Sequence, residues 1–277
     1  MKVIKTIPEM KRLRASLTGP FGFVPTMGYL HEGHLSLVRQ AKAENASVVV
    51  SIFVNPAQFG PGEDLGKYPR NLERDLSMLE KEGVAAVFTP EPRDIYPPGF
   101  STWVDVDNIT ERLEGAARPG HFRGVTTVVA KLFNIVQPQR AYFGQKDAQQ
   151  ALVLTKMAAD LDMGIEVITL PTVREPDGLA MSSRNSYLKG EEREAAKVLI
   201  KSLRLAQDLF LGGEADIRKI TDEMRRLIGK EPLARIDYIS IADTITLKEL
   251  DKVKPPALVS LAVYIGKTRL IDNIVLG

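Results

Sequence analysis

The stretch SVVVSIFV (Ser47–Val54) is a run of β-branched and other apolar residues that only serine interrupts. Such a run is typical of a strand in a parallel sheet that is covered on both faces, because neither side of it is polar. Similar short runs occur along the chain at Phe21–Pro25, Val84–Phe88, Arg140–Gly144 and Ile165–Leu170. The sequence therefore predicts several buried strands.

Between these runs, apolar residues recur at the spacing of an amphipathic helix. The helical segments are Gly33–Asn45, Leu72–Leu79 before Gly83, Val125–Ile135 before Pro138, and a stretch that continues to Leu161. This alternation predicts an α/β fold with a doubly wound, Rossmann-like parallel sheet and right-handed crossovers. Ligands of such sheets bind beyond the carboxyl ends of the strands, so the loops there are the first candidates for a site.

The pattern changes near Pro171–Gly178. Two polar amphipathic helices are expected at about Glu191–Leu211 and Ala215–Ile228, and three apolar runs follow them, ARIDYISI, ALVSLAVYI and TRLIDNIVL. Helices followed by strands indicate a smaller α+β domain. We therefore predict one domain over residues 1–173 and a second over residues 174–277.

The overall composition is that of an ordinary globular protein. The 37 Lys and Arg residues and 35 Asp and Glu residues leave a net charge of +2, which argues against a dedicated nucleic-acid-binding protein. Because cysteine is absent, a disulfide framework and a thiolate zinc site are excluded. No apolar run is long enough to span a membrane and the N-terminus lacks the apolar core of a signal peptide, so we expect a cytoplasmic protein with no membrane partner.

The segment PTMGYLHEGH (Pro25–His34) follows the first of these strands and leads into a helix. The N–H groups at a helix N-terminus attract phosphate, and Gly28 lets the backbone come close to such a ligand. His31 and His34 could add donors for a polyphosphate. From spacing alone, a phosphate site and two unrelated surface histidines are equally open interpretations. A three-histidine zinc site that includes His121 is conceivable, but the sequence around it lacks a pattern of outer residues that would orient the ligands.

A second polar segment, DGLAMSSRNSYL (Asp177–Leu188), lies at the predicted domain junction. Ser182 or Ser183 could simply cap a helix. That interpretation explains the serines but not Arg184 beside them. Together, the two hydroxyl groups and the guanidinium form a compact set of donors for a phosphate.

HEGH and MSSR together resemble the HIGH and KMSKS signatures of the nucleotidyltransferase superfamily, which includes the class I aminoacyl-tRNA synthetases. In that superfamily the first signature follows the first strand of the sheet, and the second lies on a mobile loop after the last strand. Both segments have those places in this sequence. The resemblance implies that ATP is held across the sheet and attacked at its α-phosphate.

Longer segments resemble the pantothenate synthetase family more specifically. They are PTMGYLHEGHLSLV, SIFVNPAQFGPGEDLGKYPR (Ser51–Arg70), RPGHFRGVTTVV (Arg118–Val129) and YFGQKDAQQ (Tyr142–Gln150). The family is a group of carbon–nitrogen ligases of pantothenate biosynthesis. Its reaction implies that pantoate and ATP form an enzyme-bound pantoyl adenylate, that the amine of β-alanine then displaces AMP, and that Mg²⁺ accompanies the nucleotide.

The resemblance also implies roles for individual residues. His34 matches the residue usually assigned as proton donor, and His31, Lys146 and Arg184 complete the expected catalytic set. Lys146 beside Asp147 could be an exposed charge pair, but its place after a strand suits neutralisation of the transferring phosphoryl group. The expected ATP contacts are Pro25, Thr26, Met27, Gly28, Tyr29, Leu30, His31, Glu32, Gly33, His34, Gly144, Gln145, Lys146, Asp147, Val173, Met181, Ser182, Ser183 and Arg184.

Two glutamines are the expected contacts of the acid substrate. Gln58 matches a residue that binds pantoate and lies close to β-alanine, and Gln150 matches a second pantoate-binding glutamine. Neutral amides suit pantoate, because its hydroxyls and carboxylate need both donors and acceptors. Asn55 and Arg118 could complete this polar set. For HFRG (His121–Gly124), the resemblance favours a loop near the triphosphate over a plain lead-in to a helix.

Other expectations concern variable features of the family. Gln145 stands where glutamate is common, so any role of that side chain would be weakened here. Asp75 lies where relatives carry acidic residues near magnesium, although the adjacent Arg74 argues against a metal ligand. The glycines of Phe59–Lys67 make that segment a candidate lid. The family also suggests a homodimer.

Two other functions are compatible with the same two signatures. A nucleotidyltransferase acting on a phosphorylated substrate would give a nucleotide-linked product, but it would favour Arg and Lys where Gln58 and Gln150 stand. A tRNA-charging or nucleic-acid-binding protein would need an additional binding domain. About a hundred residues beyond the sheet domain and a charge near zero leave little room for one.

Overall fold

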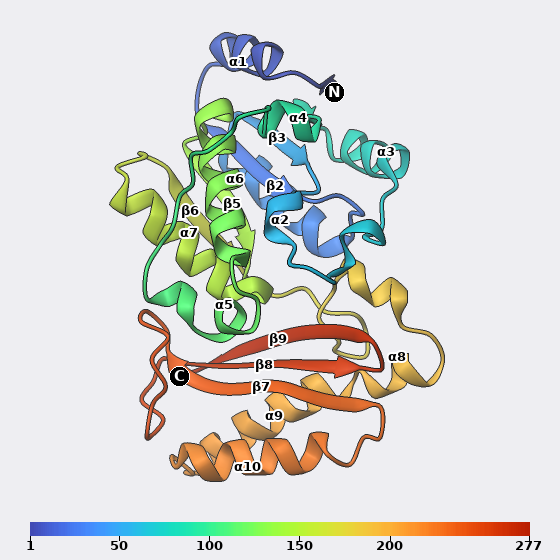
Figure 1. Ribbon diagram of the computed structural model, residues 1–277, viewed down its shortest axis with the longest axis vertical. Helices are drawn as coiled ribbons and strands as arrows, with labels where there is room; N and C mark the ends of the chain where they lie inside the picture. The colour runs from blue at the N-terminus through green and yellow to red at the C-terminus, as the bar shows by residue number, and fades with distance from the viewer. The chain divides into compact units, whose positions relative to one another are not determined.

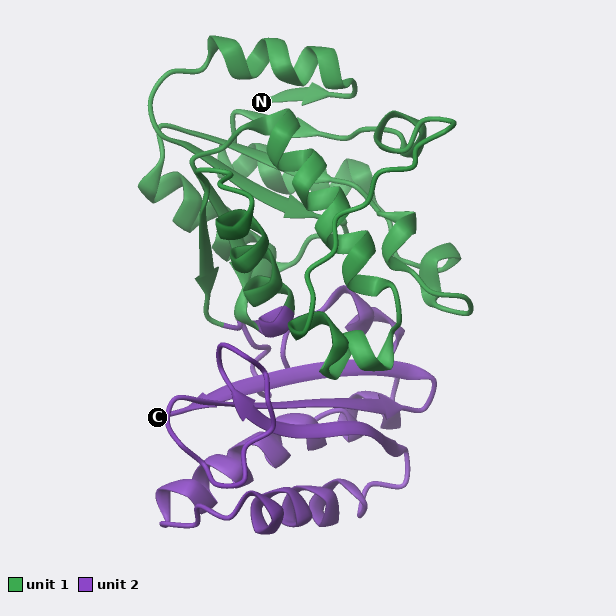
Figure 2. Ribbon diagram, turned by 60° about the vertical axis from the view of Figure 1, so that its left-hand side comes forward, with its two compact units in different colours: residues 1–145, 150–171 green, residues 146–149, 172–277 purple.

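The computed structural model describes all residues, Met1–Gly277, and the chain forms two compact units (Figure 2). Unit 1 consists of residues 1–145 and 150–171, and unit 2 consists of residues 146–149 and 172–277. The predicted division after residue 173 lies close to the one after Pro171. The sequence did not indicate that residues 146–149 belong with unit 2, and independent folding of either part stays a prediction.

Unit 1 contains a six-stranded sheet in which each strand is parallel to its neighbours (Figure 1). Its order is β1 (Lys2–Ile4), β4 (Ala86–Phe88), β3 (Ser47–Ile52), β2 (Phe21–Thr26), β5 (Arg140–Gly144) and β6 (Glu166–Leu170). The predicted Rossmann-like sheet is therefore confirmed. The edge strand β1 was not predicted, because three residues carry no usable periodicity.

Helices cover both faces of this sheet. Val24 of β2 packs in a cluster with Leu35 and Val38 of α2 (Glu32–Glu44), whereas Phe23 meets Phe133 of α6 (His121–Val136) edge to face at 6.5 Å. Because successive strand residues point to opposite faces, α2 and α6 lie on opposite sides. The other helices of this part are α1 (Ile7–Ser16), α3 (Leu72–Glu82), α4 (Pro92–Ile95), α5 (Leu113–Ala117) and α7 (Ala148–Asp160), with short 3-10 turns η1 (Pro56–Gln58), η2 (Asp64–Gly66), η3 (Ile109–Glu111) and η4 (Gln145–Asp147).

Unit 2 is the predicted α+β unit. Its antiparallel sheet has the order β7 (Ala234–Asp243), β8 (Ala257–Ile265) and β9 (Thr268–Leu276). The helices α9 (Val198–Leu211) and α10 (Ile217–Ile228) pack on this sheet and share one apolar core with it.

The helix predicted over Glu191–Leu211 is divided into α8 (Glu191–Ala195) and α9. The chain turns at Ala196, and both alanines, Ala195 and Ala196, are buried together with residues 198–200. Five buried positions among six consecutive residues cannot lie on one face of a straight helix, so the turn is needed to bury them.

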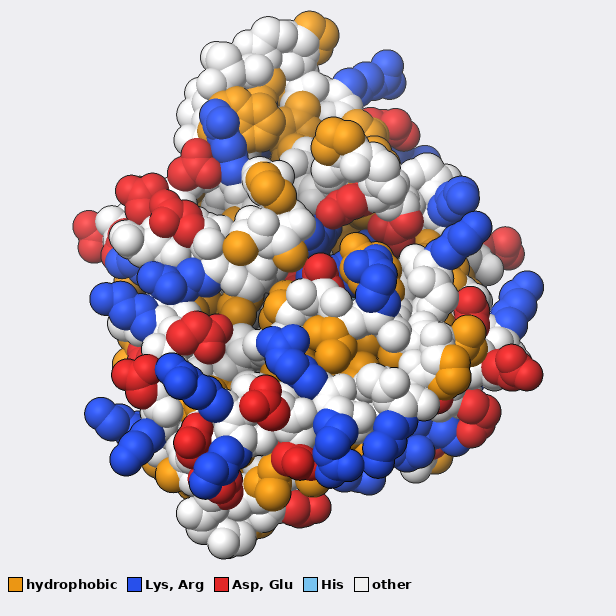
Figure 3. Space-filling view, turned by 60° about the horizontal axis from the view of Figure 1, so that its bottom comes forward, with side chains coloured by type: hydrophobic (Ala, Val, Ile, Leu, Met, Phe, Trp, Pro, Cys, Tyr) orange, Lys and Arg blue, Asp and Glu red, His pale blue; other side chains and the backbone are white.

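The surface agrees with the balanced composition. On the face drawn in Figure 3, Lys and Arg side chains lie among Asp and Glu side chains, as a net charge of +2 leads one to expect. None of the helices is both long enough and apolar enough to cross a membrane.

Candidate functional site

The predicted site residues of unit 1 follow three neighbouring strands. β3, β2 and β5 are adjacent in the sheet. From β2 the chain adds β3 and β4 on one side, and β5 and β6 lie on the other side, so the strand order reverses between β2 and β5. Since parallel strands end at the same edge, the loop after β2, the turn η1 after β3 and the segment after β5 open onto one edge of the sheet. A crevice at such a reversal point is where doubly wound sheets bind ligands.

The loop after β2 is held by a carboxylate from α3. Asp75 accepts hydrogen bonds from the N–H groups of Tyr29 at 2.6 Å and Leu30 at 2.8 Å. Gly28 has φ 83°, and a Cβ there would lie 2.9 Å from Ile52 Cγ2 and 3.1 Å from Asp75 Oδ2. Glycine is therefore required at position 28 both for its backbone conformation and for space.

Asp75 is a buried residue whose two carboxylate oxygens both serve this loop. Burial raises the pKa of Asp75, while the N–H donors of Leu30 and Tyr29 and the charge of Arg74 oppose that rise. No group of three or more His, Asp or Glu side chains in the protein is arranged to hold a metal ion. The geometry thus supports Asp75 as the anchor of the loop and offers nothing that supports it as a magnesium ligand.

The two histidines of HEGH lie together at the start of α2. Their rings are 4.1 Å apart between centroids, and the backbone N–H of His31 donates to Nδ1 of His34 at 3.3 Å. The side chains therefore stand at a helix N-terminus, which suits a polyanion. His121 is engaged elsewhere, with its two ring nitrogens on Gln58 and Arg118, so the three histidines do not form the alternative zinc site.

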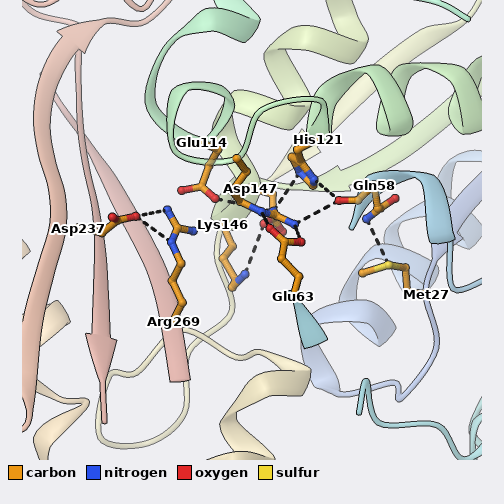
Figure 4. A network of polar contacts seen from close by, with 10 residues as sticks. Met27, Gln58, Glu63, Glu114, His121, Lys146, Asp147, Asp237 and Arg269 are labelled. Carbon is orange, nitrogen blue, oxygen red and sulfur yellow. Dashed lines mark hydrogen bonds and ion pairs between the residues drawn. The ribbon is translucent and has the colours of Figure 1, made fainter. Parts of the chain in front are cut away.

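Gln58 is fixed in η1 through its side chain. Asn55 Nδ2 donates to Gln58 Oε1 at 3.0 Å. Gln58 Nε2 lies 3.3 Å from the sulfur of Met27 in the loop after β2 (Figure 4). Asn55 is oriented in turn by the Tyr96 hydroxyl, which donates to its Oδ1 at 2.8 Å. Burial raises the pKa of Tyr96 to about 12, so it keeps this proton at neutral pH.

The backbone of η1 lies directly on the first turn of α6. A Cβ at Gly124 would be 2.2 Å from the carbonyl oxygen of Ala57 and 2.6 Å from the nitrogen of Gln58. The carbonyl of Gly124 also accepts a hydrogen bond from Asn55 Nδ2 at 3.1 Å. The HFRG segment is therefore the first turn of a helix, and its glycine allows the turn that carries Gln58 to come close.

Two side chains near the start of α6 hold the main chain of Gln58. His121 Nδ1 donates to the Gln58 carbonyl oxygen at 2.8 Å (Figure 4). Arg118 Nη2 donates to the same oxygen at 3.3 Å. Arg118 also forms a bidentate ion pair with Glu63, at 2.7 Å for both bonds. Glu63 belongs to the candidate lid, which is thus tied to Arg118, between α5 and α6. Its motion stays a prediction.

His121 is neutral in this arrangement. A carbonyl oxygen can only accept, so Nδ1 carries the proton, and Nε2 accepts from Arg118 Nη1 at 3.2 Å. Burial, with a further contribution from the charge of Arg118, lowers the pKa of His121 to about 4. Glu63 and Glu114 face the same imidazole and oppose this shift.

We expect this histidine to make the protein less stable in mild acid. Between pH 6.5 and about 4, His121 is protonated in the unfolded chain but stays neutral in the folded protein. The free energy of unfolding therefore falls as the pH drops through this range. Between pH 7 and pH 5 the loss should be about 2 kcal/mol. Urea unfolding of the wild type and of His121→Asn, which keeps an amide donor but does not titrate, measures the difference. Equal losses in the two proteins would show that His121 is not the source.

The predicted residues of unit 2 form two segments. Lys146 follows β5 closely along the chain, and its Nζ lies 3.4 Å from Asp147 Oδ1. The MSSR segment (Met181–Arg184) enters the 3-10 turn η5 (Ser183–Tyr187), where Ser182 Oγ accepts from the N–H of Arg184 at 3.3 Å. Ser182 therefore does cap a turn, as one interpretation of the sequence expected, while Ser183 is buried.

The expected ATP contacts are divided between the two units. Pro25–His34, Gly144 and Gln145 belong to unit 1, together with both glutamines expected to bind pantoate. Lys146, Asp147, Val173 and Met181–Arg184 belong to unit 2. Two groups that support predicted site residues were not indicated by the sequence. Tyr96 orients Asn55, and Asp272 binds Arg174 near the start of the segment that leads to MSSR.

The sequence matches the family model described as pantoate-beta-alanine ligase over residues 2–275. It is similar to the pantothenate synthetase of Roseiflexus sp. (strain RS-1), with 60% identity over 276 residues that cover 100% of this chain and 99% of that one. The pantothenate synthetase of Thermotoga petrophila is 55% identical over 280 residues, with 100% of both chains covered.

Two solved structures are also similar to this chain. The crystal structure of pantothenate synthetase from Thermus thermophilus superposes with a TM-score of 0.95 at 47% identity, covering 99% of each chain. The pantoate-beta-alanine ligase of Francisella tularensis, crystallised with beta-gamma ATP and beta-alanine, has a TM-score of 0.84 at 38% identity and covers 99% of this chain and 97% of that one.

Proposed function

The chain belongs to the pantoate-beta-alanine ligase family, and from that premise we propose how its residues carry out the reaction. The protein is an ATP-dependent carbon–nitrogen ligase that condenses pantoate with β-alanine through an enzyme-bound pantoyl adenylate, giving pantothenate, AMP and pyrophosphate. The observation that carries this function is the match over residues 2–275, which includes both units and both phosphate-directed segments.

Adenylation gives the carboxyl group of pantoate a good leaving group. A free carboxylate cannot accept an amine readily, because an oxide would have to leave. A carboxylate oxygen of pantoate attacks the α-phosphorus and pyrophosphate departs; the amine of β-alanine then attacks the acyl carbon and AMP departs with the original carboxylate oxygen. No nucleophile from the protein is needed. The protein contributes by orienting the substrates and by stabilising the charge that develops in the transition state.

For ATP, we propose the contacts already named in the HEGH loop, the segment after β5 and the MSSR segment. The support for the loop is its anchoring by Asp75 and the position of His31 and His34 at the start of α2. The support for Lys146 is its place directly after β5, with a positive charge and a half-buried side chain. Both features favour a phosphate that carries developing charge.

For pantoate, we propose Gln58 and Gln150. Asn55 holds the Gln58 side-chain oxygen, so the amide N–H₂ of Gln58 faces the loop after β2. Gln150 lies in the first turn of α7, which follows β5. Gln58 is also our proposed neighbour of β-alanine, on the strength of the resemblance.

We propose that Mg²⁺ enters as the counterion of ATP and not as a resident metal. No cluster of His, Asp and Glu side chains fits a metal ion, and Asp75 already accepts two backbone hydrogen bonds. Magnesium commonly keeps several waters and binds nucleotide phosphates, so a protein cage is not required.

The function is tested by incubating the protein with MgATP, pantoate and β-alanine. We expect AMP and pantothenate in equal amounts. Without β-alanine, AMP release should stop while pantoate-dependent exchange of pyrophosphate into ATP continues. A nucleotide-linked final product, or turnover that does not depend on the amine, would overturn the assignment.

Replacing either glutamine should impair the use of pantoate. We expect Gln58→Ala and Gln150→Ala to lower kcat/KM for pantoate by about tenfold, the effect of removing one hydrogen-bond partner from a polar substrate. The KM for ATP should change by much less. Gln40→Ala on α2, whose amide bonds Glu44, is the matched control. Variants that weaken ATP binding alone would contradict the proposed pantoate site.

We also propose that the enzyme acts in the cytoplasm as a homodimer, as the family resemblance implies. Sedimentation equilibrium at micromolar concentration tests the second part, and a monomer at all concentrations would contradict it.

A further inference from the structure

Two consecutive polar residues lie within the last strand, far along the sequence from the segments expected to carry chemistry. Asp272 and Asn273 of β9 are 1% and 4% exposed. Successive residues of a strand point to opposite faces, so each face of the small sheet receives one polar side chain. Buried polar groups are unfavourable unless they are paired, which makes their partners informative.

Asn273 contacts the main chain of the expected phosphate-binding lysine. Its Nδ2 donates to the carbonyl oxygen of Lys146 at 2.9 Å, across 127 positions of sequence. Both residues belong to unit 2, where the four residues 146–149 are the only part that precedes residue 172. The contact therefore joins the short segment that carries the Lys146 ammonium to the end of the chain.

Asp272 contacts the base of the hairpin that leads into MSSR. It binds Arg174 through two hydrogen bonds of 2.6 and 3.0 Å, and Arg174 also donates to the carbonyl of Gly178 at 3.1 Å. Arg174 pairs with Ala180 across this hairpin, and the N–H of Met181 donates to the carbonyl of Val173 at 3.0 Å. The hairpin thus places Met181 directly beyond its anchored base, and β9 contacts η5 as well.

We propose that Asp272 and Asn273 are positioning residues for ATP. Asn273 fixes the main chain of Lys146, and Asp272, through Arg174, fixes the hairpin that ends at Met181–Arg184. One strand of a three-stranded sheet thereby sets the separation between the lysine ammonium and the hydroxyl and guanidinium donors of MSSR. The inference rests on the proposed function, in which both segments bind the polyphosphate.

Stability alone is a poor explanation for these two residues. A buried ion pair often stabilises a protein no more than apolar residues of the same volume. At the other buried positions β9 carries Thr268, Leu270 and Leu276, none of which is charged. What the pair supplies is a defined geometry, since a bidentate guanidinium–carboxylate contact and an amide–carbonyl bond each fix one orientation.

Asn273→Asp is the sharpest test, because it keeps the shape and replaces the donor with a carboxylate oxygen, which in its ionised form has no proton to donate to the Lys146 carbonyl. We expect kcat/KM for ATP, measured by pantoate-dependent pyrophosphate exchange, to fall by about tenfold, as misplacement of a charged group does. The KM for pantoate should stay within about twofold. Ser260→Ala is the matched control, because Ser260 pairs with Asn273 across β8 and β9 and is buried without a hydrogen bond.

A double-mutant cycle identifies the route of the effect. If Asn273 acts through Lys146, Asn273→Asp should lower exchange by less than about threefold in a Lys146→Ala background. A full tenfold effect in that background, or unchanged ATP kinetics in the single variant, overturns the Asn273 part. Asn273→Ala, which introduces no buried carboxylate, replaces Asn273→Asp if the latter has a lowered melting temperature.

Asp272→Asn tests the second part. The isosteric amide keeps one acceptor for Arg174 and loses the charge, so we expect about a fivefold rise in the KM for ATP and little change for pantoate. An unchanged KM for ATP in the folded variant overturns this part. Wild-type protein in the same assay distinguishes failure of the proposed function from failure of this inference. Absence of exchange in the wild type would contradict the proposed function. Normal exchange in the wild type together with unaffected variants would contradict only this inference.

Discussion

We expect Lys146→Ala to lower the rate of pantoyl adenylate formation by about a hundredfold or more, the scale for removing one preorganised electrostatic donor. Lys146 directly follows β5, and its side chain is 19% exposed beside a single carboxylate, Asp147. Negative charge moves toward the leaving pyrophosphate as the α-phosphorus is attacked. An ammonium close to that charge stabilises the transition state more than the bound substrates.

The measurement is single-turnover release of pyrophosphate with saturating MgATP and pantoate. Lys146→Arg should recover only part of the rate, because a planar fork replaces a compact point charge. Lys156→Ala is the matched control, since Lys156 is a surface lysine of α7 paired with Asp160. A near-normal rate of adenylation by Lys146→Ala would contradict a catalytic role for this residue.

The second large effect is expected for His34→Ala, a loss of about a hundredfold in the same step. The N–H of His31 donates to Nδ1 of His34, so the proton of the neutral ring is on Nε2. We expect that Nε2–H group to donate to ATP as charge develops on the phosphate.

Two conservative variants distinguish the nitrogen atoms. The amide nitrogen of His34→Gln can approach the place of Nε2 and should restore part of the rate, whereas that of His34→Asn resembles Nδ1 and should not. Pyrophosphate exchange at saturating pantoate compares them. Equal recovery by both variants would contradict the assignment of Nε2 as the donor.

Most of the fold could be predicted from periodicity. The apolar run at Ser47–Val54 became β3, and the spacing of Leu35, Val38 and Ala41 became the buried face of α2. These elements follow from local preference and burial, which act over a few residues. The predicted single helix over Glu191–Leu211 was wrong in one respect, because tertiary burial of Ala195 and Ala196 requires a turn between α8 and α9.

The site was accessible from the sequence only as segments. HEGH and MSSR pointed to phosphate because donors of the right kind lie within a few residues of each other, and resemblance then named Gln58 and Gln150. The resemblance favoured a loop for HFRG, whereas the segment forms the first turn of α6, and its place near the triphosphate stays a prediction. His121 faces the Gln58 carbonyl, 63 positions away, and no local pattern could have indicated that pairing.

Residue spacing was sufficient to predict the doubly wound sheet, the smaller unit after it and the segments at the strand ends that are candidates for phosphate binding. Each of these predictions depends on residues close together in the sequence, because the spacing of apolar and charged residues indicates which of them are buried. The residues that hold those segments in place became visible in the three-dimensional structure alone. Asp75 binds the HEGH loop from 45 positions away, and Asn273 binds Lys146 from 127. Such contacts depend on where separate elements meet in space, and a single buried polar side chain in the sequence does not specify its partner.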